Sequence, residues 1–219
     1  MFTLELEGVR GGTRFLRDSV MQRGMYINFP IITLYQLALG FDYNRIVLEV
    51  KDPSKYAGTA QELYSYELTA PAGVSKEKLK QFMQMDLDRY LGLSGRMEKR
   101  RVDCYVLKKI GKTSEHGSSA EGLKKDSGKM DVWESEDRSI IYLRRVPFGV
   151  FIRDLNHSFL QWPCKPVIVD ETGYKSTISI DLPVKARTNM KLLAKLLLGK
   201  GFVLEKAQRV LDVFVLKER

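Results

Sequence analysis

The sequence predicts an α+β fold built from two similar halves, whose antiparallel or mixed sheets are covered on one side by helices. A short strand occurs twice: DCYVLKK begins at Asp103, and DVFVLKE begins at Asp212. Residues 82–109 align on residues 191–218 without a gap. In each half the hydrophobic periods follow the order strand, helix, strand, strand, helix, strand. These observations predict an internal duplication of two βαββαβ-like halves.

The first half is predicted to occupy residues 24–110, after an N-terminal extension over residues 1–23. Its successive elements are the strand MYINF, the helix TLYQLALGF, the strands RIVLEV and YSYELTAP, the helix EKLKQFMQMDLDRYLGL and the strand ending in YVLKK. Pro71 is expected to end its strand, because proline cannot donate a hydrogen bond to a strand ladder. Gly92 is expected to mark the turn after the second helix.

The second half is predicted to occupy residues 139–219 and to repeat this order. Its elements are the strand SIIYLRR, the helix FIRDLNHSFL, the strands PVIVDE and STISIDLP, the helix NMKLLAKLLLGKGF and the strand ending in FVLKE. Residues 111–138, between the halves, are rich in Gly, Ser and charge. We expect them to form a polar surface connector, with one short strand around Val132 and Trp133.

Length and hydrophobic content indicate a folded domain without membrane-spanning segments. The chain has 219 residues, of which 44% are hydrophobic, so it is long enough to bury a substantial core. No apolar run reaches the roughly 18 residues that cross a bilayer, so no transmembrane segment is expected. The opening MFTLELEGVRGG lacks a basic leader followed by an apolar stretch, so no secretory signal peptide is visible.

The net charge of +9, from 36 basic and 27 acidic residues, suggests nucleic-acid binding as one alternative. The excess is spread evenly, however: residues 1–110 carry 17 basic and 13 acidic side chains, and the rest carry 19 and 14. The one compact cluster, RMEKRR from Arg96 to Arg101, lies in a predicted strand. We interpret it as a solvated strand edge that discourages edge pairing, so nucleic acid is the less favoured partner.

Two ordered motifs resemble an uncharacterised bacterial domain family. APAGVSKEKLKQFMQMDLDRYLGLSGRMEKRRVDCYVLKK is similar to its APAGAS…LQ.LL..RFGL..H.E.R....Y.L pattern, and KPVIVDETGYKSTISIDL to its RPVVDKTGLTGRYDFTL stretch. The resemblance extends from Tyr26 onward, but RMEK at Arg96–Lys99 replaces a histidine-containing stretch. Members are exported proteins of soil and gut bacteria, some fused to thioredoxin-like or sensor-peptidase modules, and no activity is established for the domain. The resemblance implies a periplasmic or otherwise exported location.

The segment STISIDLPVKARTNMKLLAKLLLGKGFVLEKAQRVLDVFVL is also similar to the short N-terminal domains of secretins and TonB-dependent receptors. Those domains combine two strands with two helices and act as protein-interaction modules of the envelope. This second resemblance implies that the partner is another envelope protein or an upstream fused domain.

The residues that most often carry catalysis do not form a recognisable site. His116 and His157 lack Cys, His or carboxylate partners at zinc spacing, so no metal site is predicted. Asp170 and Glu171 are adjacent in a strand and therefore point to opposite faces. The GGT at Gly11–Thr13 lacks the spacing and the lysine of a phosphate loop, and no serine lies in a GxSxG elbow. We predict no catalytic residue and no cofactor.

The two cysteines support a thiol-redox accessory domain as a second alternative. Cys104 alternates with Val102 and Val106, a pattern that predicts a small buried hydrophobe. Cys164 lies between Pro163 and Pro166, and a reactive thiol there needs an electropositive, accessible setting. A disulfide between the two is an open alternative for an exported protein, because sequence alone does not place their Cα atoms.

The tryptophans supply the one candidate binding residue. Trp162 follows an apolar helix and is expected in the core, whereas Trp133 lies in the polar context KMDVWESED. An exposed Trp133 would anchor a partner, and the alternative is that it folds over the edge of the core. Our leading hypothesis is a non-catalytic binding or protein-interaction module of the bacterial cell envelope.

Overall fold

The computed structural model describes residues 2–4, 10–56, 62–110, 129–159 and 166–219. These residues form two compact units. Unit 1 comprises Met1–Arg100 and Leu211–Arg219, and unit 2 comprises Arg101–Val210. Each unit is described separately below.

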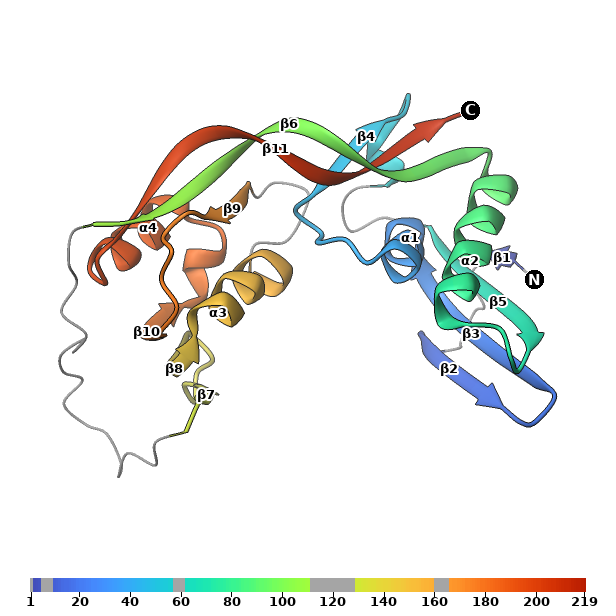
Figure 1. Cartoon of the computed structure of the whole chain (residues 1–219), viewed down its shortest axis with the longest axis horizontal. Helices are drawn as coiled ribbons and strands as arrows, with labels where there is room; N and C mark the ends of the chain where they lie inside the picture. Colours follow the sequence, from blue (N-terminus) through green and yellow to red (C-terminus); the bar gives the residue numbers. More distant parts are fainter. Residues whose placement is uncertain (1, 5–9, 57–61, 111–128, 160–165) are drawn as a thin grey trace. The chain divides into compact units, whose positions relative to one another are not determined.

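Unit 1 contains a four-stranded antiparallel sheet in the order β1-β5-β3-β2. Helices α1 and α2 pack on one face of it (Figure 1). The elements are β1 (Phe2–Leu4), β2 (Gly12–Arg17), β3 (Met21–Pro30), α1 (Ile31–Leu39), β4 (Ile46–Glu49), a 3-10 turn (Pro53–Lys55), β5 (Leu63–Pro71), α2 (Lys76–Leu91) and the start of β6 (Leu93–Lys109). Ser75 caps α2 by accepting a hydrogen bond from the Lys78 amide at 3.2 Å, and Gly92 ends it in the left-handed region, as predicted.

Unit 2 contains a three-stranded antiparallel sheet in the order β10-β8-β7, with α3 and α4 packed against it. Its elements are β7 (Asp131–Glu134), β8 (Ile140–Pro147), α3 (Phe148–Asp154), a π-helical turn (Leu155–Phe159), β9 (Val167–Asp170), β10 (Thr177–Pro183), a 3-10 turn (Val184–Arg187), α4 (Met190–Leu198) and β11 (Phe202–Glu218). The short strand predicted around Val132 and Trp133 is β7.

A third, mixed sheet has the order β4-β11-β6-β9. In unit 1, β4 pairs in parallel with the end of β11, where Phe214 faces Ile46. In unit 2, β9 pairs in parallel with the end of β6, where Cys104 faces Val167. Each of the 17-residue strands β6 and β11 therefore contributes one part to each unit.

The α+β class is confirmed, and the predicted element order occurs twice. It is β3-α1-β4-β5-α2-β6 in the first half and β8-α3-β9-β10-α4-β11 in the second. An origin of the two halves by duplication stays a prediction.

The compact units differ from the predicted halves in two respects. Residues 101–110 close the first predicted half but lie in unit 2, and residues 211–219 close the second but lie in unit 1. The expected N-terminal extension over residues 1–23 supplies β1, β2 and the start of β3 to the sheet of unit 1. Residues 13–17 of β2 are all exposed, so the strand has no buried side to create a hydrophobic period. Of the predicted connector, residues 111–128 lie outside the described residues.

The core of unit 1 holds a tyrosine ring directly against the backbone of β6. A Cβ atom built on Gly95 would lie 2.4 Å from Cε1 of Tyr35, so only glycine fits there. The Tyr35 hydroxyl donates to Oδ1 of Asp88 at 2.7 Å, and the Gly95 amide donates to the same oxygen at 2.9 Å. Burial and the hydrogen bond to Asp88 raise the pKa of Tyr35, so the hydroxyl stays protonated and keeps donating.

Substituting Gly95 by alanine should lower the free energy of unfolding by about 2 kcal/mol, because the new methyl group overpacks a filled core. Urea denaturation of the full chain measures this change. Gly12→Ala is the matched control, since Gly12 also lies in a strand and has open space at the Cβ position. Equal stability of the two variants would contradict the contact with Tyr35.

Candidate functional site

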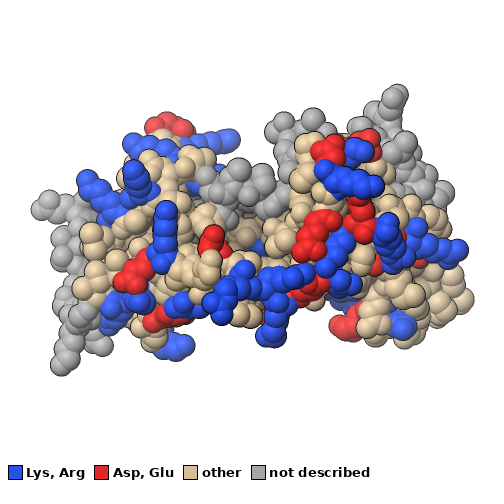
Figure 2. Space-filling view, turned by 90° about the horizontal axis from the view of Figure 1, so that it is seen from above, with Lys and Arg blue, Asp and Glu red and all other residues tan. Residues whose placement is uncertain are grey.

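The basic cluster Arg96–Arg101 lies on β6, and three of its four cations, Arg96, Lys99 and Arg100, are paired with carboxylates. Arg96 and Arg100 both contact Glu98, and Arg100 also lies 3.3 Å from Glu49. Lys217 approaches Glu49 to 2.9 Å. Figure 2 shows Lys and Arg side chains interspersed with Asp and Glu. Such neutralised charge gives a polyanion little to bind, which agrees with a solvated strand surface.

Cys104 is a buried free thiol on β6, as its alternation with valines predicted. Burial raises the pKa of the Cys104 thiol, which disfavours the thiolate that redox chemistry needs. Cys164, His116 and Trp162 lie outside the described residues. His157 is exposed on the π-helical turn after α3. Among the described residues, no group of three or more His, Cys, Asp or Glu side chains is arranged to hold a metal ion.

The adjacent carboxylates Asp170 and Glu171 serve separate structural contacts. Asp170 Oδ1 accepts hydrogen bonds from the amide and the hydroxyl of Thr172, at 2.9 and 2.6 Å. Glu171 forms a two-point ion pair with Arg209, at 2.6 and 3.0 Å, which holds the pKa of Glu171 below its usual value. The two side chains therefore do not converge on a common substrate.

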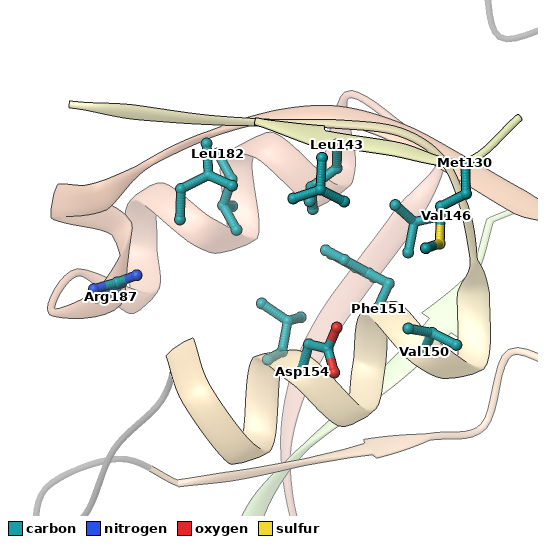
Figure 3. Close-up of a pocket in the computed structure, with 11 residues that line it drawn as sticks. Met130, Leu143, Val146, Val150, Phe151, Asp154, Leu182 and Arg187 are labelled. Atoms are coloured by element: carbon teal, nitrogen blue, oxygen red, sulfur yellow. The ribbon is translucent and has the colours of Figure 1, made fainter. Parts of the chain in front are cut away.

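Unit 2 contains an apolar cavity of about 220 Å³ between α3 and the inner face of its three-stranded sheet. Figure 3 shows Leu143 and Leu182 on the sheet side and Phe151 and Asp154 on the helix side. The lining residues are Met130, Val132, Ile141, Leu143, Val146, Val150, Phe151, Asp154, Leu155, Leu182 and Arg187. A cavity of this size accommodates one large apolar side chain rather than a cofactor-sized ligand.

Strand register divides the residues of β7 between the two faces of this sheet. Val132 is opposite Leu143, and both line the cavity. Trp133 is opposite Tyr142, which is itself opposite Asp181 on β10. Because successive side chains in a strand point to opposite faces, this second row lies on the outer face of the sheet.

The outer face carries a stacked aromatic and cationic cluster. The rings of Trp133 and Tyr142 stack at 5.3 Å, and the guanidinium of Arg144 lies 5.4 Å from the Trp133 ring centre. Arg144 Nη1 in turn donates to Oδ1 of Asp181 at 2.6 Å. Trp133, the candidate binding residue, is thus partly exposed and held in a fixed orientation on the outer face.

β7 is the last strand of its sheet and pairs only with β8 among the described strands. All four of its residues are exposed, and Val132 retains 51% of its accessible surface. Met130, just before the strand, is exposed as well. An edge strand with exposed apolar side chains is a template for pairing with another strand.

The sequence of β7 and its turn is acidic, although the chain as a whole has a net charge of +9. Residues 131–137, DVWESED, contain four carboxylates and no Lys or Arg. Asp131 and Glu134 lie on the strand itself and are exposed. The edge of β7 therefore carries negative charge beside exposed apolar side chains.

The turn after β7 fixes the position of this edge. Oδ1 of Asp137 accepts hydrogen bonds from the Ser135 hydroxyl at 2.6 Å and from the Ser139 amide at 3.0 Å. The Ser135 hydroxyl oxygen accepts from the Ile140 amide at 3.0 Å. These bonds, led by that from Ser135, lower the pKa of Asp137 to about 2.

Asn156, on the π-helical turn after α3, ties this turn to β9. Its side-chain oxygen accepts from the Ile168 amide at 2.9 Å, and its nitrogen donates to the Ile168 carbonyl at 2.9 Å and to the Ile152 carbonyl at 3.2 Å. The side chain is buried, so it satisfies backbone groups that have no access to water. The helical wall of the cavity is thereby held in place.

The sequence indicated Trp133 as a candidate binding residue but did not indicate the cavity. The residues that line the cavity have the apolar pattern of ordinary core positions. The chain matches no protein-family model, and comparisons with curated proteins and with solved structures found no match. No helix in the described ranges combines the length and the apolar character of a membrane span. The resemblance to an exported domain family stays a prediction.

The carboxylate of Asp137 should titrate near pH 2 in the folded chain, below its ordinary pKa of 3.8. Because the pKa is lowered by folding, the stabilising contribution of Asp137 is complete above pH 3.8 and is lost as the pH falls through about 2. Carbon-detected NMR of the side-chain carboxyl group measures the midpoint. In a Ser135→Ala variant the midpoint should rise, and an unchanged midpoint would contradict the hydrogen-bonded turn.

Proposed function

We propose that the chain is a non-catalytic protein-interaction module of the bacterial cell envelope, in which β7 receives an extended segment of a partner protein. The observation that carries the proposal is the exposed outer edge of β7, with the apolar cavity on one face and Trp133 on the other. The envelope location is supported by the family resemblance of the sequence.

Strand addition makes use of each feature of this edge. A segment paired with β7 would lie about 4.8 Å from it and would present its side chains alternately to the two faces. A large apolar side chain on the inner face would enter the cavity beside Val132. Its neighbours on the outer face would contact the ring of Trp133, which Tyr142 and Arg144 hold in place. Backbone hydrogen bonds would supply affinity, and the cavity would supply selectivity.

Charge narrows the class of partner segment. Asp131 and Glu134 lie along the edge, so Lys or Arg beside the apolar side chain would form ion pairs on docking. A segment with acidic residues at those positions would be repelled. We therefore expect an extended partner segment that is basic and apolar.

The two alternatives drawn from the sequence have less support. Burial of Cys104 disfavours its thiolate and so weakens the thiol-redox alternative at that residue. A redox role of Cys164 stays a prediction. Nucleic-acid binding is weakened by the ion pairs within the Arg96–Arg101 cluster.

Selection of random peptides on the immobilised full chain tests the proposal. The enriched peptides should contain one large apolar residue flanked by Lys or Arg, and a labelled peptide should bind with an affinity measurable by fluorescence anisotropy. Val132→Asp should weaken that affinity about tenfold or more, because it places a charge at the mouth of the cavity. Trp133→Ala should weaken it as well.

The matched control is Val210→Asp, which makes the same change at a valine of β11 that retains 59% of its accessible surface. This variant should bind the selected peptide as tightly as the unchanged chain. Peptides that bind Val132→Asp and the unchanged chain equally well would contradict strand addition at β7.

A further inference from the structure

In unit 1 the hairpin formed by β2 and β3 exposes apolar side chains at and near its tip. Val20, in the turn, retains 68% of its accessible surface, and Phe15 on β2 retains 67%. Leu16 and Met21 are exposed beside them. Four large apolar side chains on one hairpin are more than the scattered exposure that is normal for a soluble surface.

Hydrogen bonds hold this hairpin in place. Asp18 caps the turn by accepting from the amides of Val20 and Met21, at 2.7 and 2.8 Å. Arg17 donates to the Ala72 carbonyl at 2.9 Å, and Gln22 donates to the Pro71 carbonyl at 2.9 Å. The tip is therefore fixed to the loop that leads from β5 into α2, and its apolar side chains are displayed by a defined structure.

A groove of about 490 Å³ lies beside the hairpin, bounded by β2, β3, β5 and the helices α1 and α2. Its apolar residues include Phe15, Tyr26, Leu68, Leu79 and Met83. Its charged lining residues are Arg17, Arg23, Lys76 and Lys80, and none of the described residues that line it is Asp or Glu. Arg23 forms an ion pair with Glu67 at 2.6 Å, whereas Arg17, Lys76 and Lys80 form no ion pair with another described residue.

The segment that contains the hairpin and the segment at the start of α2 each carry more basic than acidic residues. Residues 10–30 contain four arginines and one aspartate, a balance of +3. Residues 76–80 contain three lysines and one glutamate, a balance of +2. Together these two segments supply +5 of the net +9.

We propose that this surface docks on an anionic lipid bilayer. The tip residues Val20 and Met21 enter the interface, and Arg17, Lys76 and Lys80 contact lipid phosphates at the mouth of the groove. A bilayer surface offers an apolar layer and a layer of negative charge at one boundary, which matches an apolar tip with cations in the groove beside it. An acidic protein surface would match the cations but would leave the projecting tip without an apolar phase.

Co-sedimentation of the full chain with vesicles tests this proposal at low ionic strength. The chain should sediment with vesicles of equal parts phosphatidylglycerol and phosphatidylcholine, and not with phosphatidylcholine alone. Sedimentation should decline as salt is raised, because exposed charges are screened. Val20→Asp should weaken binding about tenfold, and Lys76→Glu with Lys80→Glu should weaken it about thirtyfold or more.

Matched controls distinguish binding through this surface from the general attraction of a basic protein to anionic vesicles. Val210→Asp repeats the tip substitution at another exposed valine, and Lys200→Glu with Lys206→Glu makes the same change in net charge on exposed lysines of unit 2. Both controls should bind much more tightly than the corresponding hairpin and groove variants. Failure to bind phosphatidylglycerol vesicles, equal loss in the controls, or full binding by Val20→Asp would each overturn the proposal.

Discussion

Each compact unit depends on a strand that comes from the other half of the sequence. The core of unit 1 includes Phe214 and Leu216 from the end of the chain, and the core of unit 2 includes Leu107 from the first half. In the order of the mixed sheet, β11 lies between β4 and β6, so β4 reaches the rest of its sheet only through β11. The exchange of strand ends therefore places residues from both halves of the sequence in each core.

This exchange explains why the repeated motif is apolar at successive positions. Residues 213–216 of β11 are all buried, and of residues 104–107 of β6 only Tyr105 is partly exposed. A strand that is covered on both faces has no solvent side, so it shows a continuous apolar run instead of an alternation. The motif marks where each long strand pairs in parallel with a short one, β4 or β9.

Local pattern was enough to predict the α+β class, the order of elements and the turn at Gly92, because these features follow from periodicity and from single residues. The strand exchange was not predictable in this way, because the hydrophobic period of a segment does not show which strand it will pair with. The hairpin strand β2 was missed because its side chains are exposed on both faces. At the candidate site, the polar sequence around Trp133 indicated a candidate binding residue. The cavity, in contrast, forms only where β7, β8, β10 and α3 meet.

The dependence of each unit on both halves is tested most directly by separating them. Fragments 1–110 and 111–219 would be produced individually and examined by amide NMR, alone and after mixing. Each fragment alone should give the narrow spectrum of an unfolded chain, because its unit lacks core residues such as Phe214 or Leu107. Mixing should restore the dispersed spectrum of the full chain. A dispersed spectrum and cooperative unfolding from monomeric fragment 1–110 alone would contradict the exchange of strands.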